Sequence, residues 1–191
     1  HLKTRDLNLN GDAIESREKL FFNSDVILSK AMISKNMDYF YRNGHHDECL
    51  FIHEGSGKLL TNFGNLELSP GDYAIIPRGV IWQIDVKEKL EVLIIETNGP
   101  IKTPKRYRNK SGQLLEFSPF SERDIKVPKL TSPINDGPVN VKVKLTQGIQ
   151  SYEYKYHPFD IVGWDGYLFP WVFNINDFMP ITGKVHQPPP V

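Results

Sequence analysis

The sequence predicts an all-β protein built as an antiparallel sandwich or barrel. Short apolar runs of about four to seven residues recur from Cys49 to Thr97 at intervals of about eight to twelve residues, as in such folds. The segments between these runs are rich in Gly, Pro, Asn and Asp, which favour turns. The chain also holds 14 prolines, all of them from Pro70 onward, which disfavour long helices in that part of the chain.

The expected strands follow one another along the chain. Those of the first half are Asp25–Met32, Met37–Arg42, Cys49–Ile52, Lys58–Thr61, Leu66–Leu68, Tyr73–Ile76, Ile81–Asp85 and Leu90–Glu96. Those of the second half are Gln113–Phe117 and Val139–Leu145, the latter with clean alternation of apolar and polar residues. The segment Asp12–Leu20 is the one weak helical candidate.

Connections and an aromatic block make up much of the second half. The basic segment Lys102–Lys110 contains Pro104 and is expected to be a solvated connection, because the net charge gives no general attraction to nucleic acid. Residues 152–178 carry a dense series of aromatic side chains, which are expected to pack against one side of the sandwich.

Composition limits the class of protein. The chain has 191 residues, with 23 Lys and Arg against 23 Asp and Glu, so its net charge gives no pull toward nucleic acid or an anionic membrane. No run of apolar residues is long enough to cross a bilayer. A single cysteine, Cys49, is expected in the core and fits a reducing, cytoplasmic compartment. The absence of an initiator methionine suggests a piece of a longer chain.

Two motifs are set aside. The run from Gly55 to Lys58 lacks the further glycine and the Ser or Thr of a phosphate-binding loop. His53 lies in a strand-like run and is expected to be a structural, hydrogen-bonded polar residue.

The segment 44–82 resembles the cupin barrel signature, with its motifs in the same order. These motifs are Gly44-His-His-Asp-Glu48, Ile52-His-Glu-Gly55, Pro70-Gly-Asp72 and Ile76-Pro-Arg-Gly79. The resemblance implies a jelly-roll barrel, in which metal-binding members use three histidines and a glutamate.

The metal ligands of such a barrel are only partly present. Glu48 stands at the position of the glutamate, but His45 and His46 are adjacent, and neighbouring strand residues point to opposite faces. Trp82 stands at the position of the third histidine and offers no ligand atom. We therefore expect a degenerate, structural cupin barrel that holds no metal.

Longer motifs make the chain similar to the homogentisate 1,2-dioxygenase family from about Arg5 to its last residue. They are Arg42-Asn-Gly44, His53-Glu-Gly-Ser-Gly57, Pro70-Gly-Asp-Tyr73, Ile76-Pro-Arg-Gly79, Ser118-Pro-Phe-Ser-Glu-Arg-Asp124 and His157-Pro-Phe-Asp-Ile-Val-Gly-Trp-Asp-Gly166.

The resemblance implies a cytoplasmic Fe(II) enzyme of tyrosine and phenylalanine breakdown, which opens the ring of homogentisate with O₂ to give maleylacetoacetate. It implies assembly as a homotrimer or hexamer. It also implies that iron binds in a C-terminal domain beyond this chain. On this basis residues 1–99 form a degenerate cupin-like barrel, 100–182 add further β elements to the same N-terminal domain, and 183–191 form a Pro-rich link.

One catalytic residue follows from the resemblance. His186 opens the element His186-Gln-Pro-Pro189, which matches the position of the family's acid/base histidine. Its role would be to take a proton from the substrate hydroxyl, which suits an imidazole near neutral pH. On the residues alone, a solvated linker histidine is the alternative.

Two other classes of function stay open. One is a different cupin dioxygenase that cleaves a related hydroxylated aromatic acid. The other is a non-catalytic cupin that serves as a binding or assembly module.

Overall fold

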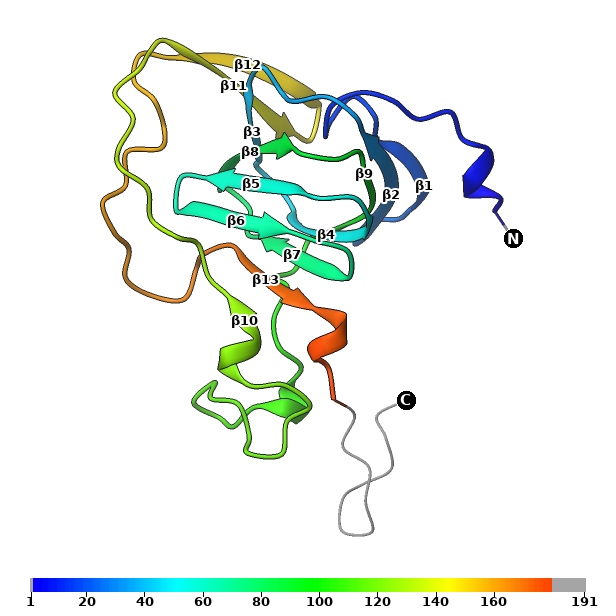
Figure 1. Cartoon of the computed structure of the whole chain (residues 1–191), viewed down its shortest axis with the longest axis vertical. Helices are drawn as coiled ribbons and strands as arrows, with labels where there is room; N and C mark the ends of the chain where they lie inside the picture. The colour runs from blue at the N-terminus through cyan, green and yellow to red at the C-terminus, as the bar shows by residue number, and fades with distance from the viewer. Residues whose placement is uncertain (1, 180–191) are drawn as a thin grey trace.

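The computed structural model describes residues 2–179, which fold into two β-sheets that face each other around one core (Figure 1). The first sheet has seven strands, and every neighbouring pair in it is antiparallel. Its strands are, in spatial order, β1 (Glu18–Phe22), β2 (Val26–Ile33), β9 (Leu90–Thr97), β4 (Asp47–Glu54), β7 (Asp72–Ile76), β13 (Trp171–Asn174) and β10 (Ile125–Lys126).

The second sheet has six strands and contains one parallel pair, formed by β11 and β3. Its strands are, in spatial order, β12 (Gly148–Tyr154), β11 (Val139–Leu145), β3 (Phe40–Asn43), β8 (Ile81–Val86), β5 (Gly57–Thr61) and β6 (Gly64–Leu68). Four single-turn 3₁₀ helices complete the elements: η1 (Thr4–Asp6), η2 (Lys105–Tyr107), η3 (Glu122–Asp124) and η4 (Ile175–Asp177). The predicted fold class, an all-β, cupin-like antiparallel sandwich with additional β elements, is confirmed.

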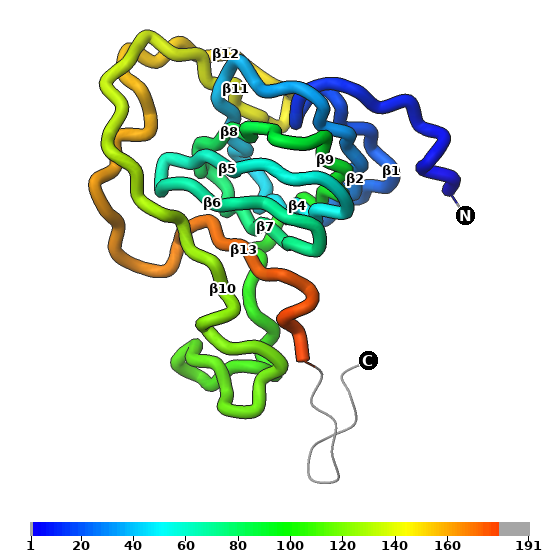
Figure 2. The backbone as a smooth tube through the Cα atoms, in the orientation of Figure 1, coloured from blue at the N-terminus to red at the C-terminus, as the bar shows by residue number. Residues whose placement is uncertain are grey.

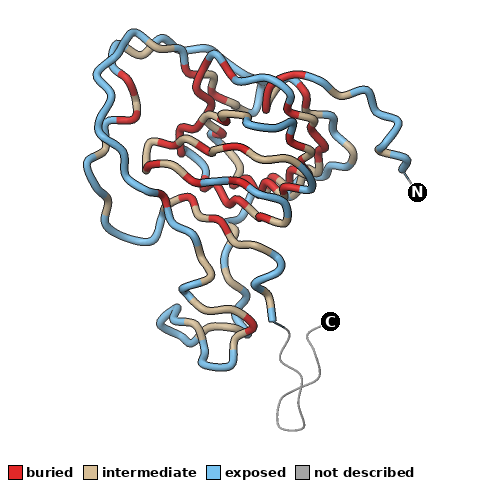
Figure 3. The backbone as a smooth tube through the Cα atoms, in the orientation of Figure 1, coloured by how far each residue is buried: buried red, intermediate tan, exposed pale blue. Residues whose placement is uncertain are grey.

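The core lies between the sheets because apolar side chains alternate along the strands. In β9 every second residue from Leu90 to Ile94 is buried, while the residues between are half-buried. The tube in Figure 3 shows that buried segments gather in the two sheets. The most deeply buried large side chains include Trp82 and Tyr41, which meet edge to face with ring centroids 5.1 Å apart.

A smaller apolar cluster covers the outer side of the second sheet. Phe159 packs there against Phe40, with ring centroids 4.9 Å apart, and beside Val141 and Val143. Only part of the aromatic block packs in this way, because Tyr167 keeps 89% of its surface exposed. The block is therefore partly a cover for the sheet and partly free surface.

Two expectations about secondary structure are wrong. The predicted strand Gln113–Phe117 makes a single isolated bridge, from Leu114 to Arg108, and otherwise lies in turns with exposed side chains. The helical candidate Asp12–Leu20 is a turn that leads into β1. Asp12 causes the turn, since its carboxylate accepts the N–H groups of Ile14 and Glu15 at 2.8 and 2.9 Å.

The turn after β4 requires a glycine. Gly55 has a φ of +88°, and a Cβ atom at this position would lie 2.0 Å from the carbonyl oxygen of Lys89. Only glycine accepts both the left-handed backbone and this close approach. The glycine therefore lets β4 pass directly beside the start of β9.

Strands from the end of the chain complete sheets that begin near its start. β13 pairs with β7, so that Trp171 lies opposite Ile75 and Val172 opposite Ala74. The backbone tube shows the chain running from β12 around one side of the molecule before it enters β13 (Figure 2). Residues 1–99 supply β1 to β9 and residues 100–179 supply β10 to β13; the division of the chain at residue 99 stays a prediction.

Candidate functional site

A buried charge cluster lies at the position where the cupin resemblance places a metal. We define this cluster as Arg17, Glu48, Glu96 and Lys144. Glu48 and Glu96 are directly opposite each other on β4 and β9, and both are 1% exposed. The Nη1 atom of Arg17 donates to Glu48 Oε1 at 2.6 Å and to Glu96 Oε1 at 2.9 Å, so one guanidinium bridges two carboxylates.

The remaining carboxylate oxygens are also bound. Trp82 donates its indole N–H to Glu48 Oε2 at 3.2 Å, and the ammonium group of Lys144 pairs with Glu96 Oε2. The guanidinium of Arg17 lies over the rings of Tyr41 and Trp82, at 5.4 and 5.8 Å from their centroids. The cluster is thus electrically balanced, with two acids and two bases.

Strand periodicity explains why these acids point inward. Glu48 shares its side of β4 with the core residues Leu50 and Ile52, and Glu96 shares its side of β9 with Val92 and Ile94. The resemblance singled out Glu48, but Glu96 was missed. The signal for Glu96 was present in the sequence, because an acid on the apolar side of a strand requires a buried partner.

Arg17 reaches the cluster from the turn before β1. Its Nε atom donates to the carbonyl oxygen of Ala13 at 2.8 Å, which aims the guanidinium into the barrel. Asp12 organises the same turn and accepts the hydroxyl of Tyr39 at 2.9 Å. A sequence pattern does not reveal this placement, since Arg17 lies 31 positions before Glu48.

The two carboxylates differ in their electrostatics. Burial raises the pKa of Glu48 above its usual value, and the charge of Arg17 only partly offsets this. Burial also opposes ionisation of Glu96, but Arg17 and Lys144 together outweigh it and lower the pKa of Glu96. Burial raises the pKa of the Tyr41 hydroxyl, and the charge of Glu48 adds to this rise.

These residues do not fit a transition metal. The guanidinium of Arg17 already lies between the two carboxylates, and Trp82 fills the third ligand position with an N–H donor. Glu48 and Glu96 have no free oxygen left for a metal ion. The expectation that this barrel holds no metal stays a prediction, and the structure supplies its physical reason.

His45 and His46 were expected to lie in a strand. They lie instead in the turn between β3 and β4. Both backbone N–H groups donate to Asn43 Oδ1, at 3.1 and 3.0 Å. The ring of His45 hydrogen-bonds the hydroxyl of Thr146 at 2.9 Å. Burial lowers the pKa of His46, whose ring Nδ1 is buried without a partner among the described residues.

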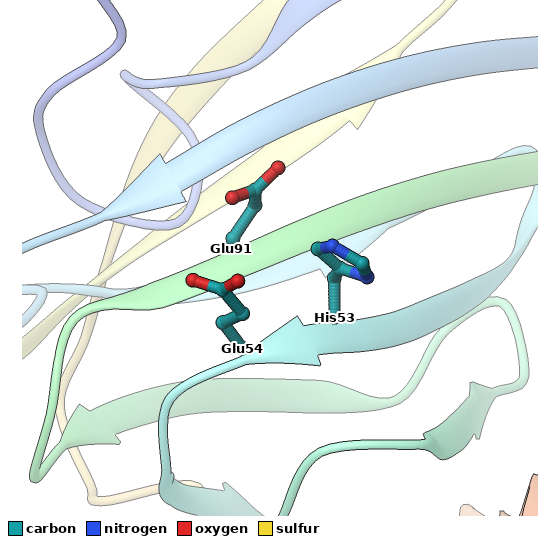
Figure 4. Close-up of side chains that lie close together, drawn as sticks. All are labelled: His53, Glu54 and Glu91. Carbon is teal, nitrogen blue, oxygen red and sulfur yellow. The ribbon is translucent and has the colours of Figure 1, made fainter. Parts of the chain in front are cut away.

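A second cluster lies on the surface and was not foreseen. His53, Glu54 and Glu91 bring one ligand atom each to within 4.8 Å of one another. Figure 4 shows the three side chains grouped on neighbouring strands. A β-bulge between Ile52 and Glu54 causes this, because it sets His53 and Glu54 together opposite Glu91. The side chain of His53 is exposed, and its expected role as a structural, hydrogen-bonded residue stays a prediction.

The surface cluster has a cation of its own. The ammonium group of Lys30 lies 2.7 Å from Glu91 Oε1 and holds that carboxylate. This ion pair lowers the pKa of Glu91. Lys30 therefore competes with a metal ion for Glu91, and the cluster alone does not define a metal centre.

The structure confirms the predicted position of Cys49 but does not describe His186. Cys49 is buried in the core region as predicted, and burial raises the pKa of its thiol to about 12. His186 lies outside the described residues, so its proposed role stays a prediction.

Residues 22–175 match the family described as homogentisate 1,2-dioxygenase N-terminal. The chain belongs to this family. It is 40% identical, over 98% of its own length, to a provisionally named dioxygenase of Saccharolobus solfataricus. It is 24% identical, over 84% of its length, to homogentisate 1,2-dioxygenase of Bradyrhizobium diazoefficiens. The chain spans 49% and 36% of the lengths of these two relatives.

Similar solved structures cover a smaller share of this chain. A cupin-2 domain protein of Shewanella frigidimarina matches with a TM-score of 0.39 and 22% identity, over 43% of this chain and 79% of its own. A cupin protein of Bacteroides fragilis matches with a TM-score of 0.41 and 17% identity, over 51% and 89%.

Within residues 2–179, no helix is both long enough and apolar enough to cross a membrane.

Proposed function

We propose that this chain is the N-terminal part of an Fe(II)-dependent dioxygenase that opens the aromatic ring of homogentisate with O₂ and forms maleylacetoacetate. The observation that carries the proposal is the family match over residues 22–175. The substrate class is a small aromatic acid, and the second substrate is O₂. The reaction belongs to tyrosine and phenylalanine breakdown.

The structure supports a division of labour within the whole protein. Arg17 occupies the position between Glu48 and Glu96, which argues against a metal ion at that point of the barrel. The proposed iron ligands therefore belong to the part of the protein that this chain does not span. The barrel's own role is that of a rigid scaffold whose internal cation is supplied by an arginine.

Within this chain, the proposed chemical contribution comes from His186. Its imidazole would accept the proton of the substrate hydroxyl as a general base near neutral pH. The last strand of the barrel, β13, ends at Asn174, so the barrel would anchor the chain a short distance before this histidine in the sequence. The remaining proposals are a cytoplasmic location and assembly as a homotrimer or hexamer.

The experiment uses the whole protein that contains this chain, loaded with Fe(II). Oxygen uptake with homogentisate is followed together with the mass of the product formed under ¹⁸O₂. We expect a ring-opened product that carries both oxygen atoms of one O₂ molecule. Phenylacetate, which has the same acid chain but no ring hydroxyls, is the matched control and should give no uptake.

Two outcomes point to the alternatives. Uptake with another hydroxylated aromatic acid, but not with homogentisate, would assign a different ring-cleaving reaction. An iron-loaded protein that consumes no O₂ with any such acid would favour a binding or assembly module.

A further inference from the structure

A basic cavity lies apart from the buried charge cluster, with which it shares no residue. It has a volume of about 500 Å³, which lies in the usual range for small-molecule sites. It is bounded by the connection after β9, by β10 and by the segment that enters β13. Its lining includes Lys102, Arg108, Lys110, Tyr167, Phe169 and Trp171.

The charge of this cavity has one sign. Lys102, Arg108 and Lys110 supply three positive charges, and none of the lining residues is acidic. Within residues 2–179 none of these three cations forms an ion pair, whereas Arg17 and Lys126 do. The Nε atom of Arg108 is buried and has no hydrogen-bond partner in the same part of the chain.

Unpaired cations around one concave surface indicate an anionic ligand. Arg108 is half-buried, while Lys102 and Lys110 are exposed, and three cations around one concave surface together raise the local concentration of anions. A buried guanidinium N–H without a partner is costly, and a carboxylate or phosphate oxygen relieves that cost. The neighbouring Arg106 differs, because it lies over the ring of Tyr107 at 5.0 Å and does not line the cavity.

One part of the cavity lining is aromatic. Phe169 and Trp171 are half-buried at the entry to β13, and Ile125 of β10 adds an aliphatic contact. Tyr167 is 89% exposed and contributes both a ring and a hydroxyl. Such a wall binds flat apolar groups by stacking and by excluding water. A bare inorganic anion would leave this wall unused.

We propose that this cavity binds a small anion carried on an aromatic ring, with the anionic group beside Arg108 and Lys110 and the ring against Phe169 and Trp171. The ligand class follows from the cavity alone, and holds whether or not the whole protein cleaves an aromatic ring. The site shares no residue with the buried charge cluster, whose cations form ion pairs with Glu48 and Glu96.

The test titrates the 191-residue chain with four probes and follows the indole N–H signal of Trp171 by NMR, assigned with Trp171→Phe. Phenylacetate carries both features, acetate only the anion, phenylacetamide only the ring, and inorganic phosphate a stronger anion without a ring. We expect saturable binding of phenylacetate with a Kd of about 1 mM or below. Acetate and phenylacetamide should each bind at least about tenfold more weakly.

Variants locate the binding. Arg108→Gln and Lys110→Gln should each weaken phenylacetate binding by roughly tenfold, the usual effect of losing a hydrogen bond to a charged group. Lys105→Gln and Arg106→Gln remove the same charge from the same connection but outside the cavity, and should leave the Kd unchanged. Raised salt should weaken phenylacetate binding in the unaltered chain, which tests the charge without any substitution.

Other results would overturn the proposal. If phosphate and phenylacetate bind with equal affinity, the aromatic residues take no part in binding. If Lys105→Gln weakens phenylacetate binding as much as Arg108→Gln does, the anion is held by diffuse surface charge and not by the cavity. A short single-stranded oligonucleotide that competes with phenylacetate and binds more tightly would assign the cavity to nucleic acid. Absence of saturation with every probe would show that the cavity is not a site.

Discussion

Glu48 and Glu96 lie directly opposite each other on antiparallel strands in the barrel interior, and a single guanidinium nitrogen of Arg17 bonds to both. Two like charges at this distance repel strongly unless a cation lies between them. In a metal-binding cupin that cation would be a metal ion. Here the chain supplies it from its own N-terminal turn, so the barrel does not depend on a metal to keep its carboxylates.

Removing Arg17 should destabilise the chain strongly. Arg17→Met leaves two buried carboxylates without their shared partner, and a broken buried pair typically costs about 3–5 kcal/mol. The free energy of unfolding from urea titration measures this. Lys35→Met is the matched control, because its pair with Glu15 is more than half exposed and should contribute far less to the free energy of unfolding.

A compensating substitution separates charge from packing. Arg17→Met combined with Glu48→Gln removes one acid together with the base, and should recover a large part of the lost stability. If the double variant is no more stable than Arg17→Met, the loss comes from the packing of Arg17 on Tyr41 and Trp82.

The barrel should take up no transition metal. After incubation with Fe(II) and dialysis, elemental analysis of the chain is expected to show well under one equivalent of iron. The measurement is made in His53→Asn, so that the surface cluster of His53, Glu54 and Glu91 does not contribute. One equivalent of iron in this variant that disappears on Glu48→Gln would mean that the metal displaces Arg17.

Two histidines should make the fold less stable in mild acid. Burial lowers the pKa of both His46 and His157 below the ordinary value of 6.5. Below that pH the two imidazoles take up protons in the unfolded chain but stay neutral in the folded chain until the pH reaches their lowered pKa values. The free energy of unfolding should therefore fall as the pH drops from about 6.5 toward the folded-state pKa values, and level off below them.

NMR titration of the two imidazoles measures their pKa values directly, and urea titrations at about pH 7.5 and 5.5 measure the change in stability. His157→Gln should flatten the dependence. A histidine whose folded-state pKa is found above 6.5 would reverse the sign of its contribution.

The aromatic block should contain both structural and dispensable rings. Phe159 is 7% exposed and packs against Phe40, so Phe159→Ala should cost about 3–5 kcal/mol. Tyr167 is 89% exposed, and Tyr167→Ala should change stability by no more than about 0.5 kcal/mol. Denaturant midpoints measure both. Similar losses in the two variants would mean that the block folds as one unit.

In the whole protein, His186 is expected to act on the substrate. His186→Asn should lower kcat for homogentisate by about 10²–10⁴-fold, the usual contribution of a general base, while the iron content stays unchanged. Gln187→Ala is the neighbouring control and should retain turnover. If His186→Asn keeps full activity and full iron content, His186 is a solvated linker residue without a catalytic role.

Strands in which apolar and polar residues alternate, and which are followed by turn residues, were predictable. A sheet with one buried face requires this alternation, and its strands must be joined by turns. Leu90–Glu96 and Val139–Leu145 therefore appear as β9 and β11, each close to its expected bounds. β12 was missed because Gly148–Tyr154 is almost wholly exposed, so its side chains carry no buried side to detect. β13 was missed because the aromatic block concealed a strand of four residues.

The candidate site was predictable only in part. Glu48 could be found from the motif, and Glu96 from its place on the apolar side of β9. Arg17 could not, because its position depends on a turn held by Asp12 and on contacts with strands far along the chain. The cavity beside Arg108 depends likewise on segments that only the folded chain brings together.

The pairing of β13 with β7 affects how the chain folds while it is being made. Synthesis proceeds from the N-terminus at about 5–20 residues per second, so β7 waits several seconds for Trp171 to leave the ribosome. During that interval one edge of β7 presents unpaired N–H and C=O groups, which invite pairing with other nascent chains. We expect the charged residues on the neighbouring exposed connections to keep such growing chains apart until the last strand closes the sheet.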